Sequence, residues 1–111
     1  MKLPLNVEIV SHGTEDPTVL AEGSSAPPLR MIIRDGDDNK LPLRGYRQIR
    51  MEIDGLINNR RLDVDGDELV LDWKRNDLRR TGRFNCRITL QQMDGKQLVC
   101  PTEKPFRVWV R

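Results

Sequence analysis

The chain has 111 residues, of which 37% are hydrophobic and 32% charged, with a formal net charge of +2. This length predicts one domain, residues 1–111, with a single core, and no apolar run approaches the ~18 residues that a membrane-spanning helix needs. The nearly balanced charge and the five aromatic residues do not favour a nucleic-acid partner, which would call for a strong basic excess and interleaved aromatic side chains.

The first ten residues, MKLPLNVEIV, contain a short alternating pattern. Apolar Leu5, Val7 and Ile9 are separated by polar residues, and this period of two predicts a β-strand with one buried face. Pro4 and the polar residues interrupt the apolar run that a signal peptide would need. We expect residues 1–17 to form an extra edge strand or an arm beside the rest of the domain.

The same alternation recurs in five later segments of the chain. Each is five to eight residues long, the usual length of a half-buried strand. The residues expected to point inward are Leu29, Met31 and Ile33; Ile49, Met51 and Ile53; Leu69, Leu71 and Trp73; Phe84, Cys86, Ile88 and Leu90; and Phe106, Val108 and Val110.

Turn signals separate these segments. Asp-Gly pairs occur at 35–36, 54–55, 65–66 and 94–95, and this dipeptide is typical of tight turns between strands. Pro27-Pro28 cannot lie inside a central strand and is expected to precede one. The only helical pattern is a single turn at 76–80, so the sequence predicts an all-β sandwich.

Both cysteines lie in GRFNCRITLQQMDGKQLVC, residues 82–100. A three-residue loop at 93–95, with its glycine in the left-handed conformation, fixes one register for this hairpin. A two-residue turn would instead direct Cys100 to the outer face. Neither register allows a disulfide, so we expect a reduced, buried Cys86 that behaves as a small hydrophobe. The pairs expected from the three-residue loop are Leu90 with Leu98, Ile88 with Cys100, and Cys86 with Thr102.

No metal, cofactor or catalytic site is predicted. Zinc would need four ligands, and the chain offers two cysteines and the distant His12. The sequence at 11–13, Ser-His-Gly, is interpreted as a turn, because no paired acid and base accompany it. The acidic stretches 35–39 and 63–68 lack the spacing of a calcium loop and are interpreted as solvated turns, although the two together could hold a cation if they meet.

The outward-facing side chains of two strands predict an interface. Trp109 is expected to point outward between Arg107 and Arg111, and the chain has fourteen arginines against five lysines. Aromatic and arginine side chains are enriched where protein surfaces bury each other, and arginine pairs with carboxylates through two parallel hydrogen bonds. The alternative is that these apolar residues are ordinary surface residues, or that a loop covers them. The second group of outward residues is Ile32 between Arg30 and Arg34, with Val70 beside Asp72.

Four stretches of the sequence resemble, in order, the small immunoglobulin-like domain of the phage baseplate upper protein family. They are EGSSAPPLRMIIRD, DNKLPLRGYRQIRMEI, LVLDWKRNDLRRTGRFNCRITLQQMDGKQLVCP and FRVWV. The shared features are a Gly and Pro entry, a Pro-Leu-x-Gly step, a tryptophan near an aspartate, a Gly-x-aromatic strand, a polar-Gly hairpin and a final Val-rich strand. The resemblance runs from Thr18 to Val110, and the segment before it lies outside the pattern.

This resemblance implies an immunoglobulin-like β-sandwich of about seven to nine antiparallel strands. It implies a structural, non-enzymatic protein of a phage or prophage tail, found in the virion and, during assembly, in the host cytoplasm. Its expected partners are other tail or baseplate subunits or a second copy of the chain, with no nucleic acid and no membrane. Family members are often the N-terminal part of a longer protein, so a distal trimerising or receptor-binding part is not expected here.

Two other classes of sandwich protein fit the sequence less well. The sequence GRFNC at 82–86 resembles the Gly-x-Tyr-x-Cys of antibody domains, but Phe84 lacks the tyrosine hydroxyl and no earlier cysteine exists. Trp73 lies too close before Cys86 to be the central tryptophan of such a domain. The alternative function is a carbohydrate-binding or adhesin module, which would need an exposed aromatic platform, and Tyr46 and Trp109 are its only candidates.

Overall fold

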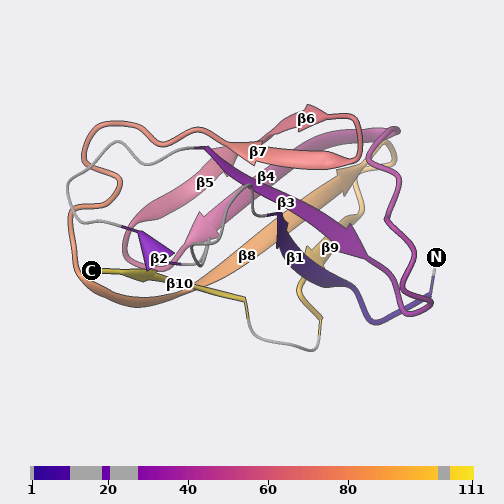
Figure 1. The fold of residues 1–111 in the computed structure, drawn as a ribbon. Coiled ribbons are helices and arrows are strands. Elements are labelled where there is room, and N and C mark those ends of the chain that lie inside the picture. The colour runs from indigo at the N-terminus through magenta and orange to yellow at the C-terminus, as the bar shows by residue number, and fades with distance from the viewer. Residues whose placement is uncertain (1, 11–18, 21–27, 103–105) are drawn as a thin grey trace.

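The computed structural model describes residues 2–10, 19–20, 28–102 and 106–111. These residues form ten strands (Figure 1), and no helix that could cross a membrane occurs among them. The strands are β1 (Asn6–Val10), β2 (Val19–Leu20), β3 (Leu29–Arg34), β4 (Tyr46–Ile53), β5 (Ile57–Arg61), β6 (Asp63–Asp65), β7 (Glu68–Leu71), β8 (Gly82–Gln92), β9 (Gln97–Cys100) and β10 (Arg107–Val110).

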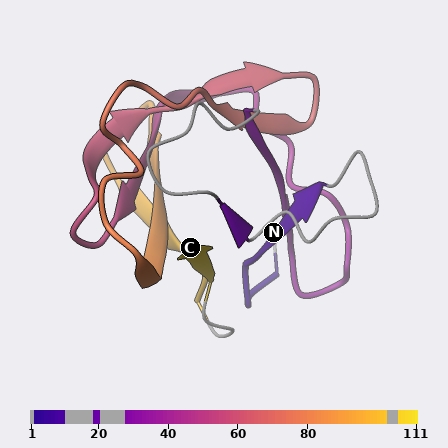
Figure 2. The same ribbon diagram turned by 60° about the vertical axis from the view of Figure 1, so that its left-hand side comes forward.

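The strands form two sheets in a β-sandwich-like, all-β arrangement. The smaller sheet has the order β1-β3-β7-β6, and the larger has the order β2-β10-β8-β4-β5, with β9 also paired to β8. Pairing is antiparallel throughout, except that β2 runs parallel to β10. Figure 2 shows the orange β8 on one side of the molecule and the violet β3 on the other. The expected strands are therefore confirmed as the frame of the fold.

The long strand β8 organises the larger sheet. One edge pairs with β4 over most of its eleven residues. The other edge pairs with β10 along residues 82–85 and with β9 along residues 88–91. The chain thus leaves β8 at one end, returns as β9, and comes back beside the opposite end of β8 as β10. This topology places Trp109 next to Arg83.

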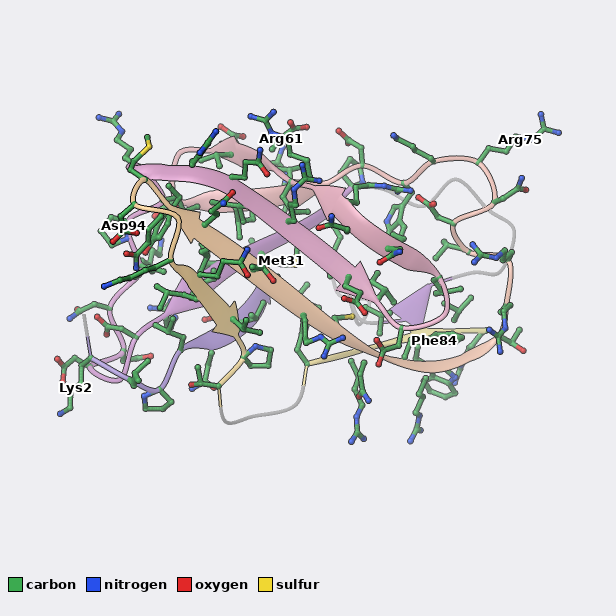
Figure 3. All side chains as sticks on the ribbon, turned by 180° about the vertical axis from the view of Figure 1, so that it is seen from behind. Lys2, Met31, Arg61, Arg75, Phe84 and Asp94 are labelled. Atoms are coloured by element: carbon green, nitrogen blue, oxygen red, sulfur yellow. The ribbon has the colours of Figure 1, made fainter. Side chains whose placement is uncertain are left out.

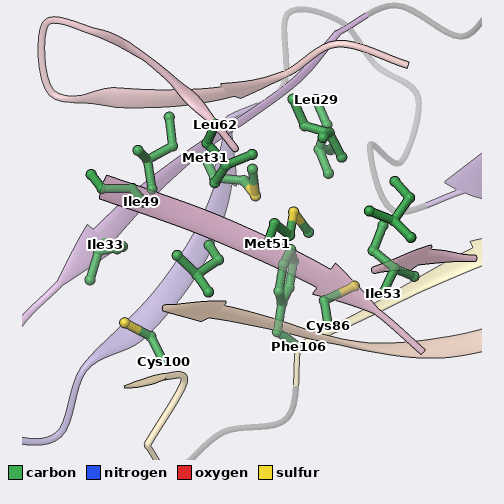
Figure 4. Packing of buried hydrophobic residues seen from close by; sticks show 14 of the residues in the cluster. Leu29, Met31, Ile33, Ile49, Met51, Ile53, Leu62, Cys86, Cys100 and Phe106 are labelled. Atoms are coloured by element: carbon green, nitrogen blue, oxygen red, sulfur yellow. The ribbon is translucent and has the colours of Figure 1, made fainter. Parts of the chain in front are cut away.

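The core lies between the sheets and contains most of the residues that the alternation predicts, together with residues that it did not predict: Leu41, Leu43, Leu56, Ile57, Leu62 and Leu78. Figure 4 shows the close packing of side chains from both sheets, including Met31 of β3 and Met51 of β4. Leu5 is also fully buried, so the N-terminal segment belongs to the domain, and β1 is an edge strand of the smaller sheet. Trp73 and Phe84 are half-buried and pack against this core from its border.

The hairpin that contains the cysteines has the predicted register. Ile88 pairs with Cys100 and Leu90 with Leu98, and the loop at 93–95 closes with a 2.8 Å hydrogen bond from the Gln92 N–H to the Lys96 carbonyl. Gly95 has a φ of 88°, the left-handed conformation that this loop requires.

The predicted pairing of Cys86 with Thr102 is wrong. Strand β9 ends at Cys100, and the Cys86 N–H donates to the Phe106 carbonyl at 2.8 Å as β10 approaches. Both cysteines are free and buried, and they lie apart in the core (Figure 4). Burial raises the pKa of each thiol to about 12.

Two segments differ from the sequence-based expectation. The predicted helical turn at 76–80 is not a helix: residues 75–78 lie in a turn, in which the Asp77 N–H donates to the Lys74 carbonyl at 3.1 Å. Residues 63–65 form the strand β6, and only Gly66 and Asp67 make the turn that leads into β7. Strand β5 also has no alternating signal, because Ile57 is its only apolar residue.

Candidate functional site

Trp109 projects from the outer face of the larger sheet, beside the first residues of β8. Its neighbours Val108 and Val110 are buried in the core, whereas Trp109 remains partly exposed. Trp109 and Arg83 are directly opposite each other in the β8–β10 ladder, so their side chains lie on the same face. Trp109 thus points away from the core, as the alternation predicts, and its role in an interface stays a prediction.

Two guanidinium groups lie against the Trp109 indole. The Cζ atom of Arg83 is 4.8 Å from the ring centroid, and that of Arg111 is 4.2 Å from it. Arg83 reaches the ring from the neighbouring strand, and Arg111 follows two residues later along the chain. Guanidinium groups are attracted to the negative face of an indole, and the attraction offsets part of the repulsion between the two cations.

Arg107 completes this group on the same face. Its Nε atom donates to the Oδ1 atom of Asn85 at 3.0 Å, and Asn85 is its partner across the ladder. We call Arg83, Trp109, Arg107 and Arg111 the Trp109 cluster. Within the described ranges, none of its three arginines forms an ion pair with a carboxylate. The sequence predicted three of the four residues; Arg83 was missed, because the register between β8 and β10 follows from no turn signal.

The neighbouring arginines on the same sheet are engaged differently. Arg87 lies 2.8 Å from a carboxylate oxygen of Glu52 and 3.7 Å from one of Asp54. Arg50 donates to the side chain of Gln48 and to the backbone carbonyl of residue 59. Among the described residues, Arg87 is thus compensated by carboxylates, whereas Arg50, like the arginines of the Trp109 cluster, forms no ion pair.

The second predicted interface group, on β3, has a different character. Ile32 is only 4% exposed, so the expectation that it offers an exposed apolar contact is wrong. It is absent from the core cluster and lies on the outer face of the smaller sheet. Arg30 and Arg34, two residues before and after it, extend in opposite directions to neighbouring strands, so that their aliphatic stems lie along this face. The alternation of apolar and polar residues predicts on which face of the sheet a side chain lies, but it does not predict how far that side chain is buried.

Ion pairs hold the two arginines of β3 in these positions. Arg30 contacts the carboxylates of Asp65 and Glu68 at 3.0 and 3.2 Å, and Arg34 contacts that of Glu8 at 2.6 Å. The hydrogen bonds to Asp65 and Glu68 raise the pKa of Arg30, and the bond to Glu8 raises that of Arg34. Val70, opposite Arg30 in the ladder, is likewise buried, at 8% exposure. This face is therefore less suited to docking than the sequence indicated.

The two acidic loops, 35–39 and 63–68, lie near each other and are joined by a lysine. The Nζ atom of Lys40 is 3.1 Å from a carboxylate oxygen of Asp67. The Asp35 carboxylate accepts hydrogen bonds from the N–H groups of residues 37 and 39, within its own loop. Among the described residues, no group of three His, Cys, Asp or Glu side chains is placed to hold a metal ion. Asp67 and Asp37 are paired here with the basic side chains of Lys40 and Lys2.

The two candidate residues for a carbohydrate platform do not meet. Tyr46 pairs with Gln92 at one end of β8, whereas Trp109 pairs with Arg83 at the other end. Tyr46 is also half-buried against the core, and this burial raises the pKa of its hydroxyl. They therefore cannot form one stacking surface. The turn proposed around His12 lies outside the described residues.

A buried ion pair near the turn at 74–77 was not predicted. Asp77 is 5% exposed, and its carboxylate accepts two hydrogen bonds from the guanidinium group of Arg60, one of them 2.8 Å long. It also accepts the Lys74 N–H at 2.6 Å. Burial alone would raise the pKa of Asp77, but the bonds from Arg60 and Lys74 outweigh burial and hold it below its usual value. The sequence signal that could have indicated this contact is the position of Asp77, three residues after Lys74, the first residue of the turn.

No protein-family model and no curated protein matches the chain.

Proposed function

We propose that the chain is a structural, non-catalytic protein of a phage or prophage tail, located in the virion and, before assembly is complete, in the host cytoplasm. It acts by docking onto neighbouring tail or baseplate subunits or onto a second copy of itself. The proposal combines the sequence resemblance to the baseplate upper protein family with the surface features of the larger sheet.

We further propose that the sandwich is immunoglobulin-like, as in that family. Such domains have strands A, B, E and D in one sheet and C, F and G in the other, with C′ added beside C in the variable type. The order β1-β3-β7-β6 corresponds to A-B-E-D, and the order β10-β8-β4-β5 corresponds to G-F-C-C′. Strand β2 then takes an extra place beside G. The agreement in strand order supports the fold assignment independently of the sequence.

The Trp109 cluster is the single observation that carries the docking function. A partly exposed tryptophan and three arginines lie together on a sheet face, and the described residues supply no carboxylate for these arginines. Tryptophan and arginine are the residues that most often dominate the energy of an interface.

The assignment to a tail can be tested on whole particles. Antibodies raised against the purified chain should label the tails of phage particles produced by the organism that encodes it, as seen by immunogold electron microscopy. The matched control is the pre-immune serum on the same particles. Labelling of lysed cells without labelling of any particle would contradict the proposal.

A further inference from the structure

We propose that the Trp109 cluster binds a carboxylate-rich segment of a partner protein. This inference rests on the proposed docking function and names the chemistry of the partner. The binding groups are the guanidinium groups of Arg83, Arg107 and Arg111, and Trp109 fixes their positions.

The geometry of the Trp109 cluster holds its arginine side chains in positions suited to binding anions. Residues 107, 109 and 111 alternate with the buried Val108 and Val110, so their side chains share the outer face. A guanidinium group that stacks on an aromatic ring keeps its N–H groups at its edge, where they can form two parallel bonds to a carboxylate. Stacking on the indole at 4.2 and 4.8 Å therefore reduces the conformational entropy that Arg111 and Arg83 would lose on binding.

The charge of the cluster also favours an anionic partner. Arg83 and Arg111 share one indole, which brings two like charges close together. Arg107 is bonded to the neutral Asn85. By contrast, Arg30, Arg34, Arg60 and Arg87 each contact a carboxylate within the described part of the chain. Carboxylates from a partner would give the arginines of the Trp109 cluster the compensation that these four already have.

Acidic protein fits the surroundings better than nucleic acid. Glu52 and Asp54 lie on the adjacent strand and its turn, where they hold Arg87 and would repel a phosphate chain running along the sheet. Farther along, neutral Thr89, Gln91 and Gln97 line a groove that Arg50 also borders. A base that stacked on Trp109 would have to compete with two guanidinium groups already against the ring. The three guanidinium groups around Trp109 thus form a local positive area that suits a short acidic segment.

The test uses the full chain labelled with ¹⁵N and a hexaglutamate peptide as the probe. The chain has two tryptophans, so two indole N–H signals are expected, and a Trp109→Phe variant assigns them. On titration, the Trp109 indole signal should shift in a saturable way while the Trp73 signal does not. Raising the salt from about 20 mM to about 300 mM should weaken binding about fivefold or more, because exposed charges are screened.

Charge-reversal variants locate the site. Arg107→Glu and Arg111→Glu should each weaken binding of hexaglutamate about tenfold. Arg61→Glu is the matched control: Arg61 is an exposed arginine of the same sheet, and Figure 3 shows it far from Phe84, the residue next to Arg83. This control should change the affinity less than about twofold. If a reversal variant is unfolded by circular dichroism, the corresponding Arg→Gln variant takes its place.

Three results would overturn the inference: no shift of the Trp109 signal, equal weakening by Arg61→Glu, or tighter binding of an oligothymidylate of similar charge than of hexaglutamate. These outcomes are separable from a failure of the proposed function. Tail labelling without hexaglutamate binding would mean that the protein docks through another surface. Hexaglutamate binding without tail labelling would retain the site and reject the tail assignment.

Discussion

The ion pair between Asp77 and Arg60 joins the turn at 74–77 to strand β5. The Asp77 side chain is 7% exposed and that of Arg60 is 21% exposed, so solvent screens the pair only in part. Replacing Asp77 with Asn would leave a largely buried guanidinium group without its counter-charge. We expect Asp77→Asn to lower the free energy of unfolding by about 2–4 kcal/mol, measured by urea denaturation. Asp72→Asn, at an exposed neighbouring carboxylate, should change it by less than about 0.5 kcal/mol.

The same carboxylate predicts how stability depends on pH. Its pKa is lower in the folded chain than in the unfolded chain, where an aspartate titrates near ~3.9. The stabilisation is therefore complete above about pH 4 and is lost as the pH falls through the lower folded-state pKa. The difference in unfolding free energy between wild type and Asp77→Asn should shrink over this range. A difference that stays constant down to about pH 2 would show that the ionised carboxylate is not its source.

Trp109, in the last strand, and Phe106, immediately before that strand, lie on opposite sides of the larger sheet. Phe106 is buried in the core, at 7% exposure, whereas Trp109 lies outside it against two arginines. Phe106→Ala should cost about 3–5 kcal/mol through the cavity that it leaves. Trp109→Ala should cost about 1–2 kcal/mol, from the lost cation–π contacts, and should retain the wild-type circular dichroism spectrum. Equal losses in thermal and urea unfolding would place Trp109 in the core instead.

At the scale of elements, the N-terminal segment is held against the loop that follows β3. The Gly36 N–H donates to the Lys2 carbonyl at 2.7 Å, and a Cβ atom on Gly36 would lie 2.4 Å from the Leu3 carbonyl oxygen. We expect Gly36→Ala to lower the unfolding free energy by about 1–3 kcal/mol, because the backbone of the segment must move away.

A double-mutant cycle isolates this contact. Removing residues 1–3 removes the carbonyl with which the new methyl group collides, so Gly36→Ala should then be neutral or slightly stabilising, through the loss of conformational entropy in the unfolded chain. Urea denaturation of the four proteins gives the coupling energy. The same cost in the full-length and truncated chains would place the strain elsewhere in the loop.

The elements differ in how far their sequences determine them. Strands with one buried face, such as β4 and β8, follow from the alternation alone. Strand β5 does not, because INNRR has one apolar residue and owes its pairing to β4 and the preceding turn. The register of the cysteine hairpin could be predicted from its three-residue loop. The register of strands that no short turn connects, such as β8 and β10, could not be predicted, and for this reason Arg83 was missed beside Trp109.

At the scale of the whole molecule, the two sheets differ in charge. The strands of the smaller sheet carry four carboxylates and two arginines, and those of the larger sheet carry seven arginines and one glutamate. Several loop carboxylates, such as Asp37 and Asp38, extend the acidic side, where they meet Lys2 and Arg34. The molecule therefore has an acidic side and a basic side, although its net charge is small. Its binding to a charged surface should depend on which side faces that surface.

This polarity predicts retention on a cation exchanger even near the isoelectric point of about 8.7. Two double variants change the net charge equally but on opposite sides: Arg83→Glu with Arg107→Glu on the larger sheet, and Lys2→Glu with Lys40→Glu beside the smaller one. Both lysines are exposed and belong to surface ion pairs, which contribute little to stability. The arginine variant should elute from a sulfopropyl column at a clearly lower salt concentration than the lysine variant, because the basic face that contacts the resin carries less positive charge. Coincident elution would show that net charge alone governs binding and that neither face is preferred.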